Sequence, residues 1–188
     1  MRIIAGTAKG KKIITPVDDK TRPLKDMVRE SIFNIINHSG LSYSRLENSC
    51  ILDLFSGVGS FGLEAISRGA KKVYFFENYG PSIDLLKKNL VNLSFLEKAS
   101  LCENDIYNQG NFKGINSKID IVFLDPPYKE NNITIILDYL YQSNLLTSDT
   151  LLILHRHKKT KDNFKKNFKI AREEIYGSAK IIFGYFIF

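Results

Sequence analysis

Short apolar runs alternate with helical patterns through most of the chain. Five runs rich in apolar residues are expected to be strands, at residues 50–54, 72–76, 99–102, 119–124 and 151–155. Between them, apolar positions recur at helical spacing over residues 61–69, 81–93 and 133–142. Apolar strands that alternate with helices predict a mostly parallel sheet covered on both faces, in the α/β class.

Both ends of the chain depart from this alternation. Residues 2–14 read as two short β runs around a Gly/Lys turn, and residues 24–36 carry a helical pattern. After the fifth strand we expect a short helix at 162–168, then two β runs within 172–188. The terminal β pair predicts one antiparallel edge strand. We therefore expect a hairpin and helix extension at residues 1–45 and an α/β domain at residues 46–188.

Composition indicates an ordinary globular protein whose charge is uneven. The chain has 188 residues, of which 44% are hydrophobic, enough for one sizeable core. It has no apolar stretch long enough to span a membrane and no signal-peptide pattern, so a cytoplasmic location is expected. The net charge is +5 over residues 1–45, −4 over 46–155 and +6 over 156–188. Basic ends around an acidic middle favour a nucleic-acid partner over a merely solvated surface.

The sequence predicts neither a metal site nor a disulfide. Cys50 and Cys102 lack metal-ligand spacing and are expected to be reduced thiols. The three histidines, His38, His155 and His157, have no acidic or thiol partner nearby in the sequence.

A glycine-rich loop follows the first expected strand. Residues 57–62 match the pattern G-x-G-x-x-G, which holds a dinucleotide pyrophosphate at a helix N-terminus. Asp53, at the end of the preceding strand, would repel a pyrophosphate but suits a ligand with an ammonium group, such as S-adenosylmethionine (SAM). Glu77 ends the next strand, where a carboxylate can bind ribose hydroxyls, and Asp105 could approach an adenine amine. Carboxylates at three successive strand ends favour a cofactor site over a turn used only for packing.

The tetrapeptide Asp125-Pro126-Pro127-Tyr128 follows the fourth expected strand. An aromatic exocyclic amine is a poor nucleophile because its lone pair is delocalised into the ring. Hydrogen bonds from its two N–H groups to the Asp125 carboxylate and the Pro126 carbonyl would favour a geometry in which the lone pair is available. The prolines stiffen the loop, and Tyr128 can stack on an extruded base. Together with the glycine loop, this motif favours methylation of a nucleobase amine over a simple Pro-Pro turn, with positioning supplying much of the catalysis.

Basic residues at the N-terminus are candidate RNA contacts, with a solvated turn as the alternative. Those on the expected hairpin are Arg2, Lys9, Lys11 and Lys12. Arg22 and Arg29 flank the start of the expected helix, where they either contact phosphate or brace the active site. Alternatively, Arg29 pairs on the surface with Asp26, three positions away. The basic run from Arg156 to Lys169 is a second candidate phosphate strip, or a solvated loop and helix face.

Several blocks of the sequence resemble the RsmD family, the bacterial 16S ribosomal RNA guanine-N2 methyltransferases. The blocks are Arg2-Ile3-Ile4-Ala5-Gly6, Gly10-Lys11-Lys12, Thr21-Arg22-Pro23, Val28-Arg29-Glu30-Ser31-Ile32-Phe33-Asn34, Leu52-Asp53-Leu54-Phe55-Ser56-Gly57-Val58-Gly59, Gly62-Leu63-Glu64-Ala65 and Asp125-Pro126-Pro127-Tyr128. The resemblance spans the whole chain. Its N-terminal blocks make it specific, because many amino-methyltransferases share the glycine and D-P-P-Y motifs.

The resemblance implies a Rossmann-like class I SAM-dependent methyltransferase with a seven-stranded sheet and an N-terminal hairpin that helps to bind RNA. It implies methyl transfer, without a metal, to N2 of one guanine in 16S rRNA, within the small ribosomal subunit or an assembly intermediate. It places Asp125 to Tyr128 in the catalytic loop. The candidate SAM-binding residues are Asp53, Phe55, Ser56, Gly57, Gly59, Glu77, Asn78, Asp105 and Ile106. We also expect a monomer.

The chain departs from the family at one place, and three alternative functions stay open. At the fifth strand this chain has His155-Arg156-His157, where relatives often carry an acidic residue, and this departure concerns the local RNA contact. A DNA adenine or cytosine amino-methyltransferase would use the same D-P-P-Y chemistry, although no separate target-recognition domain is evident. The glycine motif suggests a nicotinamide-dependent dehydrogenase, against which Asp53 and the D-P-P-Y loop argue. A non-catalytic ribosome-assembly factor would need only the basic ends, and the intact Asp125 argues against it.

Overall fold

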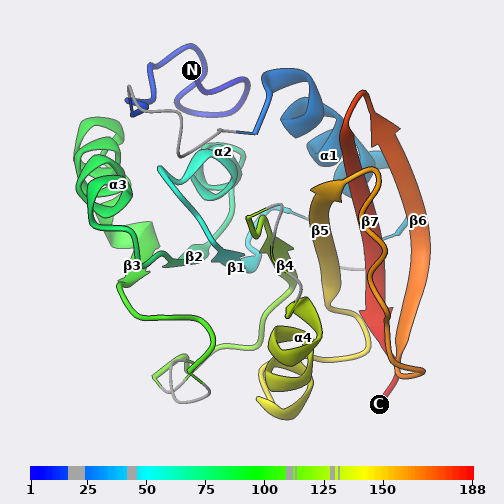
Figure 1. Ribbon diagram of the computed structural model, residues 1–188. Coiled ribbons are helices and arrows are strands. Elements are labelled where there is room, and N and C mark those ends of the chain that lie inside the picture. The colour runs from blue at the N-terminus through cyan, green and yellow to red at the C-terminus, as the bar shows by residue number, and fades with distance from the viewer. Residues whose placement is uncertain (17–23, 42–45, 109–111, 113, 128–129, 131) are drawn as a thin grey trace.

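A seven-stranded sheet in the order β3-β2-β1-β4-β5-β7-β6 forms the middle layer of the protein (Figure 1). The computed structural model describes residues 1–16, 24–41, 46–108, 112, 114–127, 130 and 132–188. The strands are β1 (Cys50–Leu54), β2 (Lys72–Phe76), β3 (Ala99–Cys102), β4 (Ile121–Leu124), β5 (Leu151–His157), β6 (Phe168–Tyr176) and β7 (Ala179–Phe186). Strands β1 to β5 are parallel, and β7 pairs antiparallel with both β5 and β6.

Helices cover both faces of the sheet, as Figure 1 shows. The helices are α1 (Asp26–His38), α2 (Ser60–Ser67), α3 (Gly80–Leu93) and α4 (Ile133–Gln142), with a 3-10 turn, η1, at Leu96–Lys98. Successive strand residues point to opposite faces. Phe123 of β4 therefore packs in the core beneath α1, α2 and α3, whereas Leu124 packs in the core beneath α4. Burial on both faces explains why the central strands read as continuous apolar runs.

Helix α2 lies close against the sheet. Phe61 stacks between Phe33 of α1 and Phe123 of β4, with ring centroids 4.9 and 4.0 Å apart. A Cβ atom on Gly62 would lie 2.3 Å from the ring of Phe75. The third glycine of the motif is thus needed for close helix-to-strand packing.

The N-terminal segment 1–14 packs over α2 (Figure 1). The expected pair of β runs forms a single antiparallel bridge, Arg2 to Lys12, and the Ile3 amide donates a hydrogen bond to the Lys11 carbonyl at 2.9 Å. Ile3 and Ile13 are buried in the same core cluster as α1, α2 and α3. The segment therefore shares its core with the sheet domain.

The expected α/β alternation is confirmed, with one correction near the C-terminus. The helix expected at residues 162–168 is absent: residues 161–165 have no regular structure, and β6 begins at Phe168. The terminal β pair provides the expected antiparallel edge strand: β6 lies at the edge and pairs antiparallel with β7, which is inserted between β5 and β6. None of the described helices is long and apolar enough to cross a membrane.

Candidate active site

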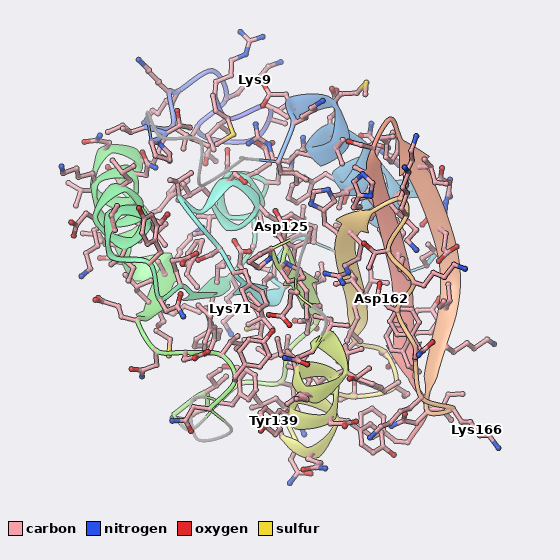
Figure 2. All side chains as sticks on the ribbon, viewed as in Figure 1. Lys9, Lys71, Asp125, Tyr139, Asp162 and Lys166 are labelled. Carbon is pink, nitrogen blue, oxygen red and sulfur yellow. The ribbon has the colours of Figure 1, made fainter. Side chains whose placement is uncertain are left out.

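Most of the candidate residues lie where the parallel strands end. Leu54 of β1 is in register with Leu124 of β4, and Leu124 is in register with Leu154 of β5. The residues that follow these positions therefore meet at one edge of the sheet, where open α/β sheets bind their ligands. Figure 2 places Asp125 near the middle of the molecule.

The loop after β1 relies on left-handed backbone conformations. Phe55, Gly57 and Gly59 have φ angles of 60°, 55° and 84°. A Cβ atom on Gly59 would lie 2.5 Å from the Leu86 side chain, whereas a Cβ atom on Gly57 would meet nothing within 4 Å. Ser56 fixes the loop to β2, since its amide donates to the Phe76 carbonyl at 3.0 Å. The loop is thus packed at Gly59 and has free space at Gly57.

Asp53 holds the glycine loop from beneath. Its side chain is fully buried, and its Oδ2 accepts a hydrogen bond from the Gly62 amide in the first turn of α2 at 2.9 Å. Burial raises the pKa of the Asp53 carboxyl well above its usual range, and the charges of Asp125 and Glu77 act in the same direction. The Gly62 hydrogen bond opposes the shift. In this structure Asp53 therefore acts on the loop and is not open to a ligand.

Glu77 joins the end of β2 to the glycine loop. Its Oε2 accepts a hydrogen bond from the Gly57 amide at 2.6 Å. Its Oε1 accepts from the amides of Asn78 and Tyr79, at 3.0 and 2.9 Å, just before α3. Glu77 is half-buried, and Asn78 is exposed. The carboxylate therefore lies beside Gly57, next to the free space of the loop.

The residues after β3 include an acidic, an apolar and an aromatic side chain. Asp105 is exposed, and its Oδ1 accepts a hydrogen bond from the Tyr107 amide at 3.0 Å, whereas Ile106 is buried in the core beneath α4. The rings of Phe55 and Tyr107 are 6.3 Å apart. Burial and the neighbouring Glu130 raise the pKa of the Tyr107 hydroxyl. Phe55 and Tyr107 thus lie close together, although one follows β1 and the other follows β3.

Asp125 sits beside the first strand and faces a histidine. Its amide donates to the Leu54 carbonyl at 3.2 Å, and its Oδ1 lies 2.7 Å from Nδ1 of His155. Pro126 is buried and Pro127 is exposed. Tyr128 lies outside the described residues.

The loop after Asp125 is held from the other face of the sheet. Arg156 is fully buried, and its Nη2 donates to the Glu130 carbonyl at 2.6 Å and pairs with Asp162 at 3.0 Å. Arg156 is therefore not part of an exposed phosphate strip. Lys158, Lys159 and Lys161, which follow it, are exposed.

Arg29 does not fit the expectation of a phosphate contact. Its side chain is fully buried, where it donates to the Arg2 carbonyl and pairs with Asp26 at 3.0 Å. Burial lowers the pKa of its guanidinium, and the charges of Glu64 and Asp26 oppose that shift. Arg29 instead braces the N-terminal segment. Arg22 lies outside the described residues, and the hairpin residues Arg2, Lys9, Lys11 and Lys12 are exposed.

The contact between His155 and Asp125 was not foreseen from the sequence. The two residues are 30 positions apart, and only the pairing of β4 with β5 brings them together. A histidine directly after an apolar strand was the available signal. Among the described residues, no group of three or more His, Cys, Asp or Glu side chains is placed to hold a metal ion.

The chain is similar to known proteins over nearly its whole length. The family described as "Conserved hypothetical protein 95" matches residues 1–185. The "Putative rRNA methyltransferase YlbH" of Bacillus subtilis is 30% identical, with 94% of each chain covered. The "Ribosomal RNA small subunit methyltransferase D" of Haemophilus influenzae is 32% identical, over 94% of this chain and 89% of the relative.

A solved structure shows the same fold over nearly the full chain. The "Putative methyltransferase yhhF" of Escherichia coli superposes with a TM-score of 0.81 at 25% identity, over 99% of this chain and 97% of that one. Its match includes the N-terminal segment as well as the sheet domain. The chain therefore belongs to the family described as "Conserved hypothetical protein 95", and the resemblance to the RsmD family is confirmed.

Proposed function

We propose that this protein transfers a methyl group from SAM to the exocyclic N2 of a guanine in 16S rRNA of the small ribosomal subunit. The observation that carries the proposal is the hydrogen bond between the ends of β4 and β1: the Asp125 amide donates to the Leu54 carbonyl, directly before the glycine loop. An amine held at Asp125 would therefore lie beside a ligand held by that loop. The name of the Haemophilus influenzae relative supports small-subunit rRNA as the substrate.

The glycine loop and the next two strand ends fit SAM. Gly57 offers free space beside the Glu77 carboxylate, which suits ribose hydroxyls. Asp53 would keep the loop in shape, and Asp105 and Ile106 would border the adenine together with Phe55. The remaining candidate contacts are Ser56, Gly59 and Asn78. When bound, SAM would supply a methyl group on a positively charged sulfur, and that sulfur would keep the electron pair of the C–S bond when the methyl group passes to nitrogen.

The chain's own residues act on the amine. The Asp125 carboxylate and the Pro126 carbonyl each accept one N–H of the target amine, which holds the nitrogen with its lone pair toward the methyl group. After methyl transfer the nitrogen is positively charged and must lose a proton. The Asp125 carboxylate accepts that proton, which then passes to water. Tyr128 is proposed to stack on the base. This chemistry depends on positioning and requires no metal or covalent nucleophile.

The exposed hairpin is proposed to bind RNA. Arg2, Lys9, Lys11 and Lys12 are exposed on the segment that packs over α2, and Figure 2 shows Lys9 at the edge of the molecule. Phosphate contacts of this kind position RNA without reading its sequence. We keep residues 1–45 as the RNA-binding extension and residues 46–188 as the methyltransferase domain of a cytoplasmic monomer.

Labelled methyl transfer distinguishes the proposal from its alternatives. The purified protein is incubated with labelled SAM and, separately, with small-subunit particles lacking the modification, with naked 16S rRNA and with duplex DNA. We expect label in the particles or the rRNA. Label in DNA alone would favour a DNA amino-methyltransferase. SAM binding without label in any polymer would favour a non-catalytic assembly factor.

A further inference from the structure

We propose that His155 is a positioning residue that fixes the carboxylate plane of Asp125, so that one carboxylate oxygen faces the target amine. The proposal rests on the function proposed above, since it assigns a role for that reaction to a residue outside the D-P-P-Y loop. The motif by itself provides the carboxylate. The structure adds the side chain that orients it.

The placement of His155 follows from strand pairing. Leu124 and Leu154 are paired in parallel register, so the next residues, Asp125 and His155, emerge side by side from β4 and β5. Residues at this position share one face of the sheet with Phe123 and Ile153. The approach of Nδ1 to Oδ1, at 2.7 Å, is therefore built into the sheet.

We assign the proton of this contact to Nδ1 of His155. An ionised carboxylate can only accept hydrogen bonds, so the Nδ1 atom of His155 is the donor to Oδ1 of Asp125. Oδ1 is then occupied, and Oδ2 is the oxygen that we assign to the amine. The last torsion of an aspartate side chain is broad, so a single attachment at Cβ does not fix the carboxylate plane. The donor on β5 supplies the second point.

The surroundings cover the histidine side of the contact. The His155 side chain is 9% exposed and the Asp125 side chain is 24% exposed, so the carboxylate reaches the site while its partner is covered. On the other side of His155, β7 places the apolar Ile181 in register. The next residue, Arg156, points to the opposite face, where it holds the Glu130 carbonyl and pairs with Asp162. Consecutive residues of β5 thus hold Asp125 at the start of the catalytic loop and Glu130, which lies beyond its end.

Three variants separate the hydrogen bond from the bulk of the ring. His155→Ala removes the donor. His155→Asn puts an amide N–H on Cγ, the same place as Nδ1, whereas His155→Gln moves its amide one carbon further. We expect the Ala and Gln variants to lower kcat by between about tenfold and a hundredfold, as small misplacements of a reacting group do. The dissociation constant for SAM and the melting temperature should change little, and the Asn variant should recover most of kcat.

Nuclear magnetic resonance tests the pair without substrate. In spectra that correlate the ring nitrogens with ring protons, in mildly alkaline buffer, His155 should carry its proton on Nδ1. His157 is an internal control, because its Nδ1 accepts a hydrogen bond from the Lys159 amide and its proton belongs on Nε2. The substitution Asp125→Ala should shift the His155 signals and leave those of His157 in place.

The outcomes separate this inference from the proposed function. If the wild type methylates rRNA and His155→Ala retains its kcat, the positioning role is wrong. The same holds if Asn is as slow as Ala, or if His155 is protonated on Nε2. If the wild type methylates no polymer, the proposed function fails and the role of His155 fails with it, even where the spectra show the pair.

Discussion

The guanidinium of Arg29 and the carboxylate of Glu64 lie side by side in the interior, both fully buried, with Nε 3.8 Å from Oε2. Glu64 also accepts hydrogen bonds from the amides of Ile4 and Ala5, at 2.7 and 2.9 Å, and from Nε of Arg68 at 2.7 Å. One carboxylate on α2 therefore anchors both α1 and the N-terminal segment. Because α2 starts at the glycine loop, the proposed RNA-binding and SAM-binding segments share this anchor.

Removal of Glu64 should destabilise the protein strongly. Glu64→Ala leaves the buried Arg29 with only the exposed Asp26 as a carboxylate partner, and breaking a buried ion pair from one side costs about 3–5 kcal/mol. Chemical denaturation measures this change. Glu97→Ala, at an exposed position, should change the free energy of unfolding by less than about 0.5 kcal/mol. Equal effects of the two substitutions would show that Glu64 is not an anchor.

Substitution of Gly57 should weaken SAM binding beyond its effect on stability. Gly57→Ala strains a left-handed backbone and fills the free space beside Glu77. Gly177→Ala is a matched control, because Gly177 has a φ angle of 63° and equally open surroundings in the β6–β7 turn. We expect the SAM dissociation constant, measured by calorimetry, to rise at least about tenfold for Gly57→Ala, equivalent to ~1.4 kcal/mol. The control should bind SAM as the wild type does.

Neutralisation of the hairpin lysines should weaken RNA binding and flatten its salt dependence. The triple variant Lys9→Ala, Lys11→Ala, Lys12→Ala removes three candidate phosphate partners. For each lysine that binds a phosphate, its removal should reduce the slope of log K against log salt by about 0.7–0.9. The charge-matched control replaces the exposed Lys71, Lys98 and Lys118, which lie near the starts of β2, β3 and β4. An equal change of slope in the control would remove the hairpin from the RNA interface.

Asp53 should make stability fall as the pH rises. Burial holds the pKa of its carboxyl above the usual value, so the folded state binds a proton that the unfolded state has released. Between the two pKa values, the free energy of unfolding therefore decreases with increasing pH. Asp53→Asn retains an oxygen for the Gly62 amide and does not ionise. The stability of Asp53→Asn relative to the wild type should thus grow as the pH rises above the usual carboxyl range, as denaturation at several pH values can test.

The fold was largely predictable because its strands are buried on both faces. Such strands read as uninterrupted apolar runs, and their spacing with the helices indicates a parallel sheet. The helix expected at residues 162–168 was wrong, although Phe164 and Phe168 are four positions apart, as residues on one face of a helix are. In the structure these rings stack, 4.8 Å apart, while Phe168 already begins β6. Tertiary packing thus outweighed a local pattern of few residues.

The sequence indicated which strand ends carry the candidate residues, but not which side chains contact one another there. A carboxylate after an apolar strand is visible in the sequence, so Glu77 and Asp125 could be selected. The burial of Arg29 and Arg156 could not be predicted, because it depends on partners such as Glu64 and Asp162 in the folded chain. The pairing of His155 with Asp125 likewise depends on the register between β4 and β5.

The identity of the methylated nucleoside tests the central claim most directly. Small-subunit particles lacking the modification are treated with SAM and the wild type or Asp125→Ala, and the digested RNA is analysed by mass spectrometry. The proposed function predicts N2-methylguanosine with the wild type and none with Asp125→Ala, although the variant should still bind SAM. A different methylated nucleoside, or near-normal N2-methylguanosine from Asp125→Ala, would contradict it.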